Sequence, residues 1–425
     1  MTYRSIWRWH FHAGLLCIPI VIVLALTGSI YLFKPQIDAF VDRDVDALIV
    51  TGTRATGEQH IAAALASLPG SRLFAYEVPV QADDAVRVHV YSADGSGRIV
   101  YVHPHTLEIL KSIPHTARLT EIVRMIHNNL MAGRVGSVLI ELAASWAIIM
   151  LGTGLYLWWP REGNGAAGVL YPRLRQGRRV LWRDLHAVTG VWVSSLAMFL
   201  LITALPWTLV TGEAIGKMRS WAAPTPGDWS TRPADEHAGH RVRPAGSVIN
   251  GSLTVDKVIA RIADENLDAP VRVYLPQENQ PHWRVRSETQ NRPRVRELQI
   301  DPSTGALVEE QKFSDKSLLD RSILVGIAAH EGQLFGPVNQ LLGFLTATGL
   351  MMLSTSAVVM WWRRRPGGSL GIPAPRVPGF RIGLALRTGI VLLGLLLPVL
   401  GLSLVLLWIF DLATRRFTEA RAAGP

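Results

Sequence analysis

Cysteine is almost absent from this chain of 425 residues. The single thiol, Cys17, lies inside a long apolar run near the N-terminus, so a structural disulfide within the chain is excluded. One cysteine also cannot supply a Cys-x-x-Cys-His motif or the thiolates of an iron–sulfur cluster, which excludes a covalently attached c-type heme and such clusters. Any cofactor must be held by other ligands.

The chain is rich instead in long apolar runs. Hydrophobic residues make up 49% of it and the mean hydropathy is +0.22, which is too apolar for an ordinary soluble protein. A bilayer crossing needs roughly 20 apolar residues. Five such runs lie near residues 11–33, 138–159, 187–210, 338–362 and 382–410. No small-residue cleavage site follows the first run, so we expect an uncleaved anchor. The sequence therefore predicts an α-helical integral membrane protein with about five transmembrane helices.

Acidic residues are scarce in three short segments at the ends of these runs. The N-terminus and the loops 161–184 and 363–381 carry thirteen arginines, against only Glu162 and Asp184. Short arginine-rich loops stay in the cytoplasm, so the N-terminus is predicted to be cytoplasmic. This local excess accounts for the whole formal charge of +10, so a nucleic-acid partner is not expected. Tryptophans gather at the same boundary, as an interfacial belt in a lipid bilayer would. They are Trp7, Trp9, Trp158, Trp159, Trp182, Trp361 and Trp362.

Two longer segments are predicted to lie on the extracytoplasmic side. Each begins with a helical stretch, Glu58 to Leu68 and Val255 to Ala263, and continues into alternating segments typical of antiparallel strands. We therefore expect one small α+β domain in each. The predicted order is: span 1–33, domain 34–126, span 127–160, cytoplasmic loop 161–184, span 185–210, domain 211–329, span 330–362, cytoplasmic loop 363–381, span 382–410 and extracytoplasmic tail 411–425. The cytoplasmic segments are too short for a flavin domain and carry no nucleotide-binding glycine loop.

Histidines recur at matched positions in the two halves of the chain. His10 is followed by Gly14 and Thr27-Gly28, and His186 by Gly190 and Thr203-Ala204, at identical spacings. His127 and His330 likewise precede Gly, Val and Trp-Trp in the same register over 31 residues. This pattern predicts an internal tandem repeat.

The predicted topology places these histidines in pairs. His10 and His186 open outward-running spans on the cytoplasmic side, while His127 and His330 precede inward-running spans on the other side. A non-covalent b-type heme needs one imidazole from each of two helices. We therefore predict two heme b groups with these four residues as iron ligands, and no separate catalytic residue. The alternative for each histidine is an imidazole at the membrane interface that does not act as a ligand. His12 competes with His10, but lies about 200° around the helix from it.

Other residues are candidates for contacts with such hemes. Glu141 is an ionisable group inside a span and is a functional candidate by default. For the heme propionates, Arg8 or Arg183 on the inside and Arg134 on the outside are plausible partners. The glycines Gly14 and Gly190 suit either a close heme approach or close helix packing. His237 and His240 lie in a Pro- and Gly-rich stretch that resembles a solvated linker.

Several motifs resemble the PepSY-associated transmembrane helix family over nearly the whole chain. They are WRWHFHAGL at Trp7, ELAASW at Glu141, GLYLWWPR at Gly154, DLHAVTG at Asp184, HEGQLFG at His330 and MWWRRRP at Met360. Within that family the chain looks most like the inner-membrane ferric-siderophore reductases, which hold two hemes. The resemblance implies that the four histidines are the heme ligands and that the two extracytoplasmic domains are PepSY-like and periplasmic. Thr203-Ala204 and His103-Pro104 depart from the repeated pattern.

The expected function follows from these points. We expect a bacterial inner-membrane reductase that passes electrons to ferric iron in a periplasmic siderophore and releases Fe(II). The electron donor is expected to be quinol or a separate cytoplasmic reductase, because the fused flavin domain of some relatives is missing. The alternative is a non-enzymatic PepSY membrane protein that binds or restrains an envelope partner, or assists ligand import.

Overall fold

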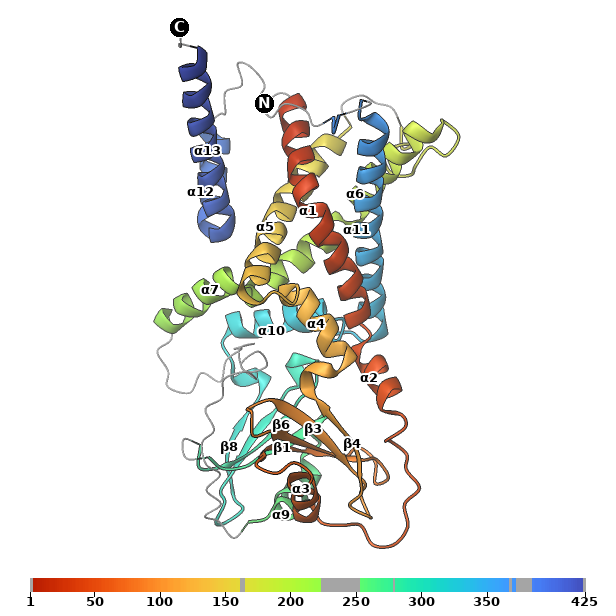
Figure 1. Cartoon of the computed structure of the whole chain (residues 1–425), viewed down its shortest axis with the longest axis vertical. Coiled ribbons are helices and arrows are strands. Elements are labelled where there is room, and N and C mark those ends of the chain that lie inside the picture. Colours follow the sequence, from red (N-terminus) through yellow and green to blue (C-terminus); the bar gives the residue numbers. More distant parts are fainter. Residues whose placement is uncertain are drawn as a thin grey trace. The chain divides into compact units, whose positions relative to one another are not determined.

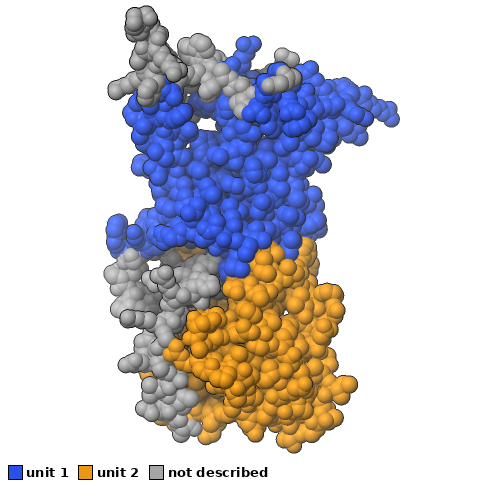
Figure 2. All heavy atoms as spheres, viewed as in Figure 1, with its two compact units in different colours: residues 1–30, 124–226, 341–425 blue, residues 31–123, 227–340 orange. Residues whose placement is uncertain are grey.

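The computed structural model describes residues 3–160, 165–222, 253–277, 280–366, 369–371 and 384–422 (Figure 1). His237, His240, Arg376 and Arg381 lie outside the described residues. The chain divides into two compact units, coloured in Figure 2. Unit 1 comprises Met1–Ile30, Arg124–Pro226 and Leu341–Pro425, and unit 2 comprises Tyr31–Val123 and Gly227–Gln340.

Four helices among the described residues are long and apolar enough to cross a bilayer. They are α1 (Tyr3–Tyr31), α5 (Gly133–Trp158), α6 (Arg178–Ala204, extended to Trp207 by a 3-10 turn) and α11 (Pro337–Arg364). At about 1.5 Å per residue each exceeds the roughly 30 Å of a hydrocarbon core. The protein is a multi-pass membrane protein. The helix α6 begins seven residues before the expected span 185–210, inside the predicted loop 161–184.

The fifth expected span, 382–410, is not a single helix. The structure divides it into α12 (Leu384–Leu396) and α13 (Pro398–Ala422). Pro398 has no backbone N–H and its ring disfavours a continuous helix at this point. The two helices pack closely, since a Cβ on Gly394 would lie 3.2 Å from Cα of Gly401. The apolar part of each of these two helices is shorter than that of the four spans and is too short to be counted as a span. Of the five expected spans, four are thus found among the described residues, and part of the expected tail 411–425 is helical.

Unit 2 is built on one antiparallel sheet. Its strands are β1 (Arg72–Val78), β2 (Val86–Tyr91), β3 (Gly97–Val102), β4 (Ile109–Pro114), β5 (Val271–Tyr274), β6 (Trp283–Ser287), β7 (Glu297–Ile300) and β8 (Leu307–Gln311). Their order is β4-β3-β2-β1-β5-β6-β7-β8. The strands β1 and β5 pair with Tyr76 opposite Val273. The two α+β domains expected from the sequence are thus joined edge to edge in a single sheet.

Two helices cover one face of this sheet. They are α3 (Gly57–Ala66) and α9 (Val255–Ile262), which coincide with the helical stretches expected from the sequence (Figure 1). Alternate strand residues such as Val88, Val100 and Val285 turn to this side and form one core with the helices. Each helix also starts at a threonine N-cap, Thr56 or Thr254, whose hydroxyl accepts a backbone N–H. The strand alternation expected from the sequence is therefore present, and each helix has a threonine cap.

The N-termini of α3 and α9 exchange carboxylate contacts. The Asp256 carboxylate of α9 accepts the backbone N–H of Gly57 in α3, at 2.8 and 3.0 Å. The Glu58 carboxylate of α3 accepts the N–H of Val255 in α9 at 2.5 Å. Each acid thus neutralises the positive end of the other helix. These contacts join the two halves of the sheet on the side opposite to the charged face described below.

Two of the four histidines lie on short helices outside the four spans. The remaining helices are α2 (Lys34–Asp42), α4 (Leu119–Asn129), α7 (Leu209–Ala222) and α10 (Leu318–His330). Short 3-10 turns lie at His115–Ala117, Ala263–Glu265, Arg292–Arg294 and Phe313–Asp315. His127 lies in α4 and His330 ends α10. The chain leaves α4 through Leu130, Met131 and Gly133, all with positive φ, before α5 begins. The expected spans 127–160 and 330–362 therefore start later than predicted.

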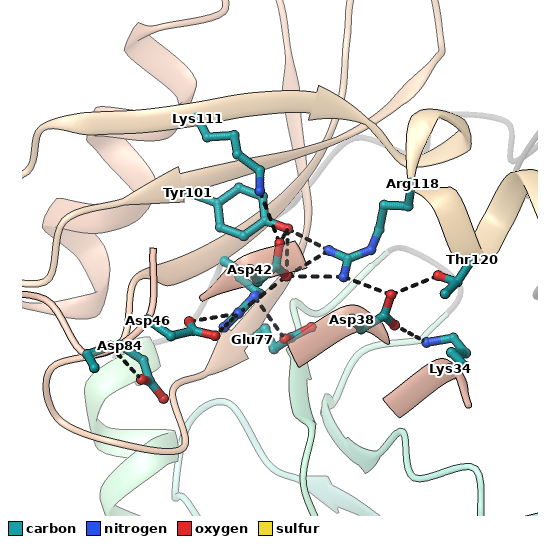
Figure 3. Close-up of polar contacts among 12 residues, drawn as sticks. Lys34, Asp38, Asp42, Asp46, Glu77, Asp84, Tyr101, Lys111, Arg118 and Thr120 are labelled. Atoms are coloured by element: carbon teal, nitrogen blue, oxygen red, sulfur yellow. Dashed lines mark hydrogen bonds and ion pairs between the residues drawn. The ribbon is translucent and has the colours of Figure 1, made fainter. Parts of the chain in front are cut away.

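A buried ion cluster lies on the face of the sheet opposite to α3 and α9 (Figure 3). At its centre is Asp42, the last residue of α2, whose side chain is 3% exposed. Its carboxylate accepts hydrogen bonds from Lys111 Nζ, Tyr101 Oη and the Arg118 guanidinium at 3.0 to 3.2 Å. Because these cations surround it, the pKa of Asp42 is lowered despite its burial. The cluster ties α2 and the residue before α4 to strands β3 and β4.

Buried charges continue along the same face across the joint between the two halves. His89 Nε2 of β2 lies 3.0 Å from Glu77 Oε2 of β1, and the Arg272 guanidinium of β5 donates to that same oxygen at 3.0 Å. The pKa of Glu77 is lowered, because the nearby cation outweighs burial. A carboxylate of β1 therefore holds a cation of β5 across the strand pair.

Lowering the pH from about 7.5 to about 5 is expected to weaken the fold through His89. Burial, with the cation Arg272 acting in the same direction, lowers the pKa of His89 from 6.5 to about 4. The unfolded chain therefore takes up the proton first, so stability that is complete above about pH 6.5 is lost as the pH falls toward 4. At about pH 5 the loss is roughly 2 kcal/mol. Melting temperatures of the purified protein in detergent would measure it. The change His89→Gln should flatten this pH dependence, and an equally steep profile would contradict the assignment.

Candidate functional site

Two of the four singled-out histidines meet within unit 1. His10 of α1 and His186 of α6 have ring centres 6.3 Å apart, with ring planes at 85°. Two imidazole nitrogens bound to one metal ion at about 2 Å, with each ring centre about 1 Å further out, put the ring centres roughly 6 Å apart. An edge-to-face ring contact has a similar spacing. The hydrogen bonds of the rings therefore decide which nitrogens are available.

His10 is held by a threonine of the neighbouring span. Its Nδ1 lies 3.0 Å from Thr153 Oγ1 of α5. The Thr153 hydroxyl has one proton, and its own donor contacts go to the carbonyls of Ile149 at 2.9 Å and Met150 at 3.2 Å. Its oxygen must therefore accept the proton of Nδ1. The neutral ring then carries its free lone pair on Nε2, the form that binds a metal ion.

His186 is held in the same way by α11. Its Nδ1 lies 3.1 Å from Ser356 Oγ and 3.1 Å from the carbonyl oxygen of Leu353. The Ser356 hydroxyl donates to that same carbonyl at 2.9 Å, so both oxygens act as acceptors toward the ring. Again Nε2 is left as the lone-pair nitrogen. Both rings of the pair are thus in the tautomer that two axial ligands of one metal ion require.

A third histidine repeats this arrangement. His127 Nδ1 lies 2.9 Å from Thr27 Oγ1 of α1, whose hydroxyl donates to the Val23 carbonyl at 2.7 Å. The next residue, Gly28, leaves room for the ring, because a Cβ there would lie 3.2 Å from Cε1 of His127. Gly154, after Thr153, has the same 3.2 Å relation to Cε1 of His10. In α1 and α5, therefore, the threonine of a Thr-Gly pair contacts an imidazole from another helix, and the glycine leaves room for the ring.

The fourth histidine, His330, belongs to unit 2, whereas His127 belongs to unit 1. His330 is the last residue of α10 and is followed by Glu331, whose carboxylate lies 3.7 Å from the Arg292 guanidinium. Its predicted role as a ligand stays a prediction. Within the described ranges, no group of three or more His, Cys, Asp or Glu side chains could hold a bare metal ion. A heme supplies four nitrogen ligands of its own, so the protein has to provide only two.

His12 differs from His10 in its surroundings. Its Nε2 is buried and has no hydrogen-bond partner in the described part of the chain, and its ring contacts Phe11. The ring of His186 and the hydroxyl of Thr153 both contact the ring of His10. The geometry therefore favours His10 over His12 as the residue that meets the second helix.

Glu141 has a structural role. Its side chain is fully buried, and its two carboxylate oxygens accept the backbone N–H groups of Val210 and Thr211 at 2.8 and 2.9 Å. The Thr211 hydroxyl donates to it as well, at 2.7 Å. These groups form the first turn of α7, so the carboxylate caps that helix and meets its positive end. His127 and Glu141 lie on separate helices, α4 and α5.

The arginines expected near heme propionates have different surroundings. Arg183 is exposed and its guanidinium donates to the buried carboxylate of Asp184 at 2.8 Å, beside Arg173 at 2.7 Å. Arg134 is exposed at the start of α5, and Arg8 is partly buried in α1. Arg183 therefore already has a carboxylate partner.

The glycines Gly14 and Gly190 face neighbouring side chains. A Cβ on Gly14 would lie 3.5 Å from Met150 Cε, and one on Gly190 would lie 3.5 Å from Leu353 Cδ2. These contacts are those of close helix packing. The hydroxyl partners Thr153 and Ser356 were not singled out from the sequence. The dipeptide Thr153-Gly154, which repeats Thr27-Gly28, is the signal that could have found the first of them.

The family model of the PepSY-associated TM region matches residues 7–364, which is most of the chain. The chain belongs to the PepSY-associated TM region family. The matched region of this family member includes all four helices that can cross a bilayer, the sheet of unit 2 and the four histidines. No curated protein matches the chain.

Proposed function

We propose that this PepSY-associated protein is a di-heme b-type reductase that carries electrons through the inner membrane to ferric siderophore iron in the periplasm. The observation that carries the proposal is the pair His10 and His186, whose rings lie 6.3 Å apart with both Nδ1 atoms held by other groups. A heme bound there would supply an iron that accepts and releases one electron. The donor set of two neutral imidazoles fits such a heme.

The residues around this pair favour electron transfer over oxygen chemistry. With His10 and His186 both bound to the iron, a heme held there would have no open position for oxygen or another small molecule. Both residues lie on apolar helices that can cross a bilayer. Such helices would keep water away from a heme iron bound there and would hold it within the membrane. The chain therefore acts by holding and insulating a centre that exchanges electrons.

For a second heme the proposal retains His127 and His330. Their spacing along the chain matches in both halves, and His127 has the same threonine contact as His10. Arginine-rich segments support a cytoplasmic N-terminus and an inner-membrane location. The electrons would come from quinol or from a separate cytoplasmic reductase.

The substrate assignment rests on chemistry and on the family resemblance. Hard oxygen ligands of a siderophore hold Fe(II) far less firmly than Fe(III), so transfer of one electron per iron releases the metal. The resemblance to inner-membrane ferric-siderophore reductases supports such a substrate and its periplasmic side.

Spectroscopy and reoxidation of the purified full-length protein test the proposal. A pyridine hemochrome assay after expression with sufficient heme should give two non-covalent hemes per chain, with a low-spin spectrum. Protein reduced with dithionite should then be reoxidised by a ferric hydroxamate siderophore, with Fe(II) trapped by a ferrous chelator. Protein without heme would overturn the proposal in favour of a non-enzymatic role in binding an envelope partner. Heme-loaded protein that stays reduced against ferric siderophores, but is oxidised by another periplasmic acceptor, would overturn the substrate alone.

A further inference from the structure

We infer that Thr153 and Ser356 are positioning residues that fix the orientation of the His10 and His186 rings and lower the midpoint potential of the heme between them. This inference rests on the proposed function. Its starting point is that the two hydroxyls lie on two different helices, α5 and α11, and each accepts an Nδ1 proton from a histidine on a third or fourth helix. Each ring is thus held by an oxygen that is not on its own helix.

The contacts of the two rings correspond in detail. His186 contacts the carbonyl of Leu353 and the hydroxyl of Ser356, three residues further along α11. His10 interacts with the carbonyl of Met150 and the hydroxyl of Thr153, again three residues further along α5. Residues three apart lie on one face of a helix. Each imidazole therefore meets the same carbonyl-and-hydroxyl pair.

This double contact restricts rotation of each ring. A single acceptor would let an imidazole turn about its hydrogen bond, whereas two oxygens on one face, with Gly154 against the edge of the His10 ring, leave one orientation. The observed result is an angle of 85° between the ring planes. Near-perpendicular imidazoles leave the two iron d orbitals that point between the ligands close in energy. The hydroxyls therefore control a property that electron paramagnetic resonance measures directly.

The same hydrogen bonds affect the electron affinity of the iron. An imidazole whose Nδ1 proton is drawn toward an acceptor is a more basic ligand, and a more basic ligand stabilises Fe(III) over Fe(II). Removal of the hydroxyl acceptor should therefore raise the midpoint potential. The carbonyls of Met150 and Leu353 remain as partners, so the heme itself should stay bound.

The test compares Thr153→Val, Thr153→Ser and Ser356→Ala with the wild type. Valine keeps the volume of threonine but removes the hydroxyl, and serine keeps the hydroxyl. The matched control is Thr346→Val in α11, because the buried Thr346 hydroxyl donates to the Leu342 carbonyl of its own helix. Redox titration in detergent gives the two midpoint potentials, and electron paramagnetic resonance gives the low-spin signal of each heme.

We expect all variants to keep two hemes per chain. In Thr153→Val and in Ser356→Ala, the midpoint potential of one heme should rise by up to 59 mV. For one electron this corresponds to a tenfold change in the reduction equilibrium. The low-spin signal of that heme should change as well, while Thr153→Ser and Thr346→Val leave both readings near those of the wild type. Unchanged potentials and signals in heme-loaded Thr153→Val and Ser356→Ala would overturn the inference and leave the proposed function intact. Absence of heme in the wild type would instead overturn the proposed function. Should Thr153→Val lose its heme, Ser356→Ala decides.

Discussion

Replacing His10 or His186 by alanine is expected to reduce the heme content from two to one per chain. Under the proposed function each change removes one of the two proposed iron ligands, and the single Cys17 cannot form the Cys-x-x-Cys-His motif that would hold the macrocycle covalently. The remaining imidazole can bind only a five-coordinate, weakly held heme. The pyridine hemochrome assay and the Soret spectrum of purified protein measure the loss.

The control for this experiment is His12→Ala, two residues from His10 on the same helix. It should keep both hemes, because the ring that lies 6.3 Å from His186 is that of His10. If His12→Ala loses a heme and His10→Ala keeps it, the ligand assignment is wrong. A variant of His127 should remove the other heme and leave the spectrum of the first unchanged.

Replacing Asp42 by alanine is expected to cause the largest loss of stability in unit 2. The side chain is 3% exposed, and its carboxylate is the shared acceptor of Lys111, Arg118 and Tyr101. Removing one partner of a buried ion pair leaves uncompensated charge and typically costs 3–5 kcal/mol. Because Arg118 also pairs with Asp38, we expect about 3 kcal/mol. The melting temperature of the full chain in detergent should fall accordingly.

The matched control is Asp44→Ala, two residues further along the chain. Its side chain is 81% exposed, so its ion pair with Arg43 contributes little. The change Asp42→Asn keeps the shape and one acceptor, and should be intermediate. Equal melting temperatures for Asp42→Ala and Asp44→Ala would show that the cluster in Figure 3 does not support the fold.

The spans were largely predictable from the sequence, because a bilayer crossing requires a long apolar helix and little else competes with that signal. The exception is the run 382–410. Its composition is that of a span, yet Pro398 and the close approach of Gly394 to Gly401 make it two helices. Apolar length alone does not reveal such a break, whereas proline inside the run is a local warning of it.

The sheet could be predicted only in part. The alternating segments that follow the two helical stretches predicted antiparallel strands, and strands are present there, among them β2 and β6. The pairing of β1 with β5 joins residues about 200 positions apart. Strand propensity contains no information on such a partner, because the contact depends on tertiary packing. The sequence therefore predicted two domains where the structure has one sheet.

For the candidate site, spacing was informative about which histidines meet but not about their surroundings. The matched positions of His10 and His186 predicted that the two rings meet, and within unit 1 they do. Glu141 was singled out only as a functional candidate, because a buried carboxylate in a span has the same sequence signature whether it serves a redox centre or caps a helix. Only the contacts with Val210 and Thr211 distinguish these roles.

The joint between the halves of the sheet has a further consequence for assembly. Tyr76 and Val273, which are opposite each other in the strand pair, each lie three residues before a proline at the end of their strands, Pro79 and Pro276. Antiparallel pairing of equivalent strands is an isologous contact, the kind that relates two identical subunits by a twofold axis. The contacts of Asp256 with Gly57 and of Glu58 with Val255 are reciprocal in the same way, as a local twofold axis requires. A protein with only one half would expose the β1 edge, and a second copy of itself could close it as a homodimer.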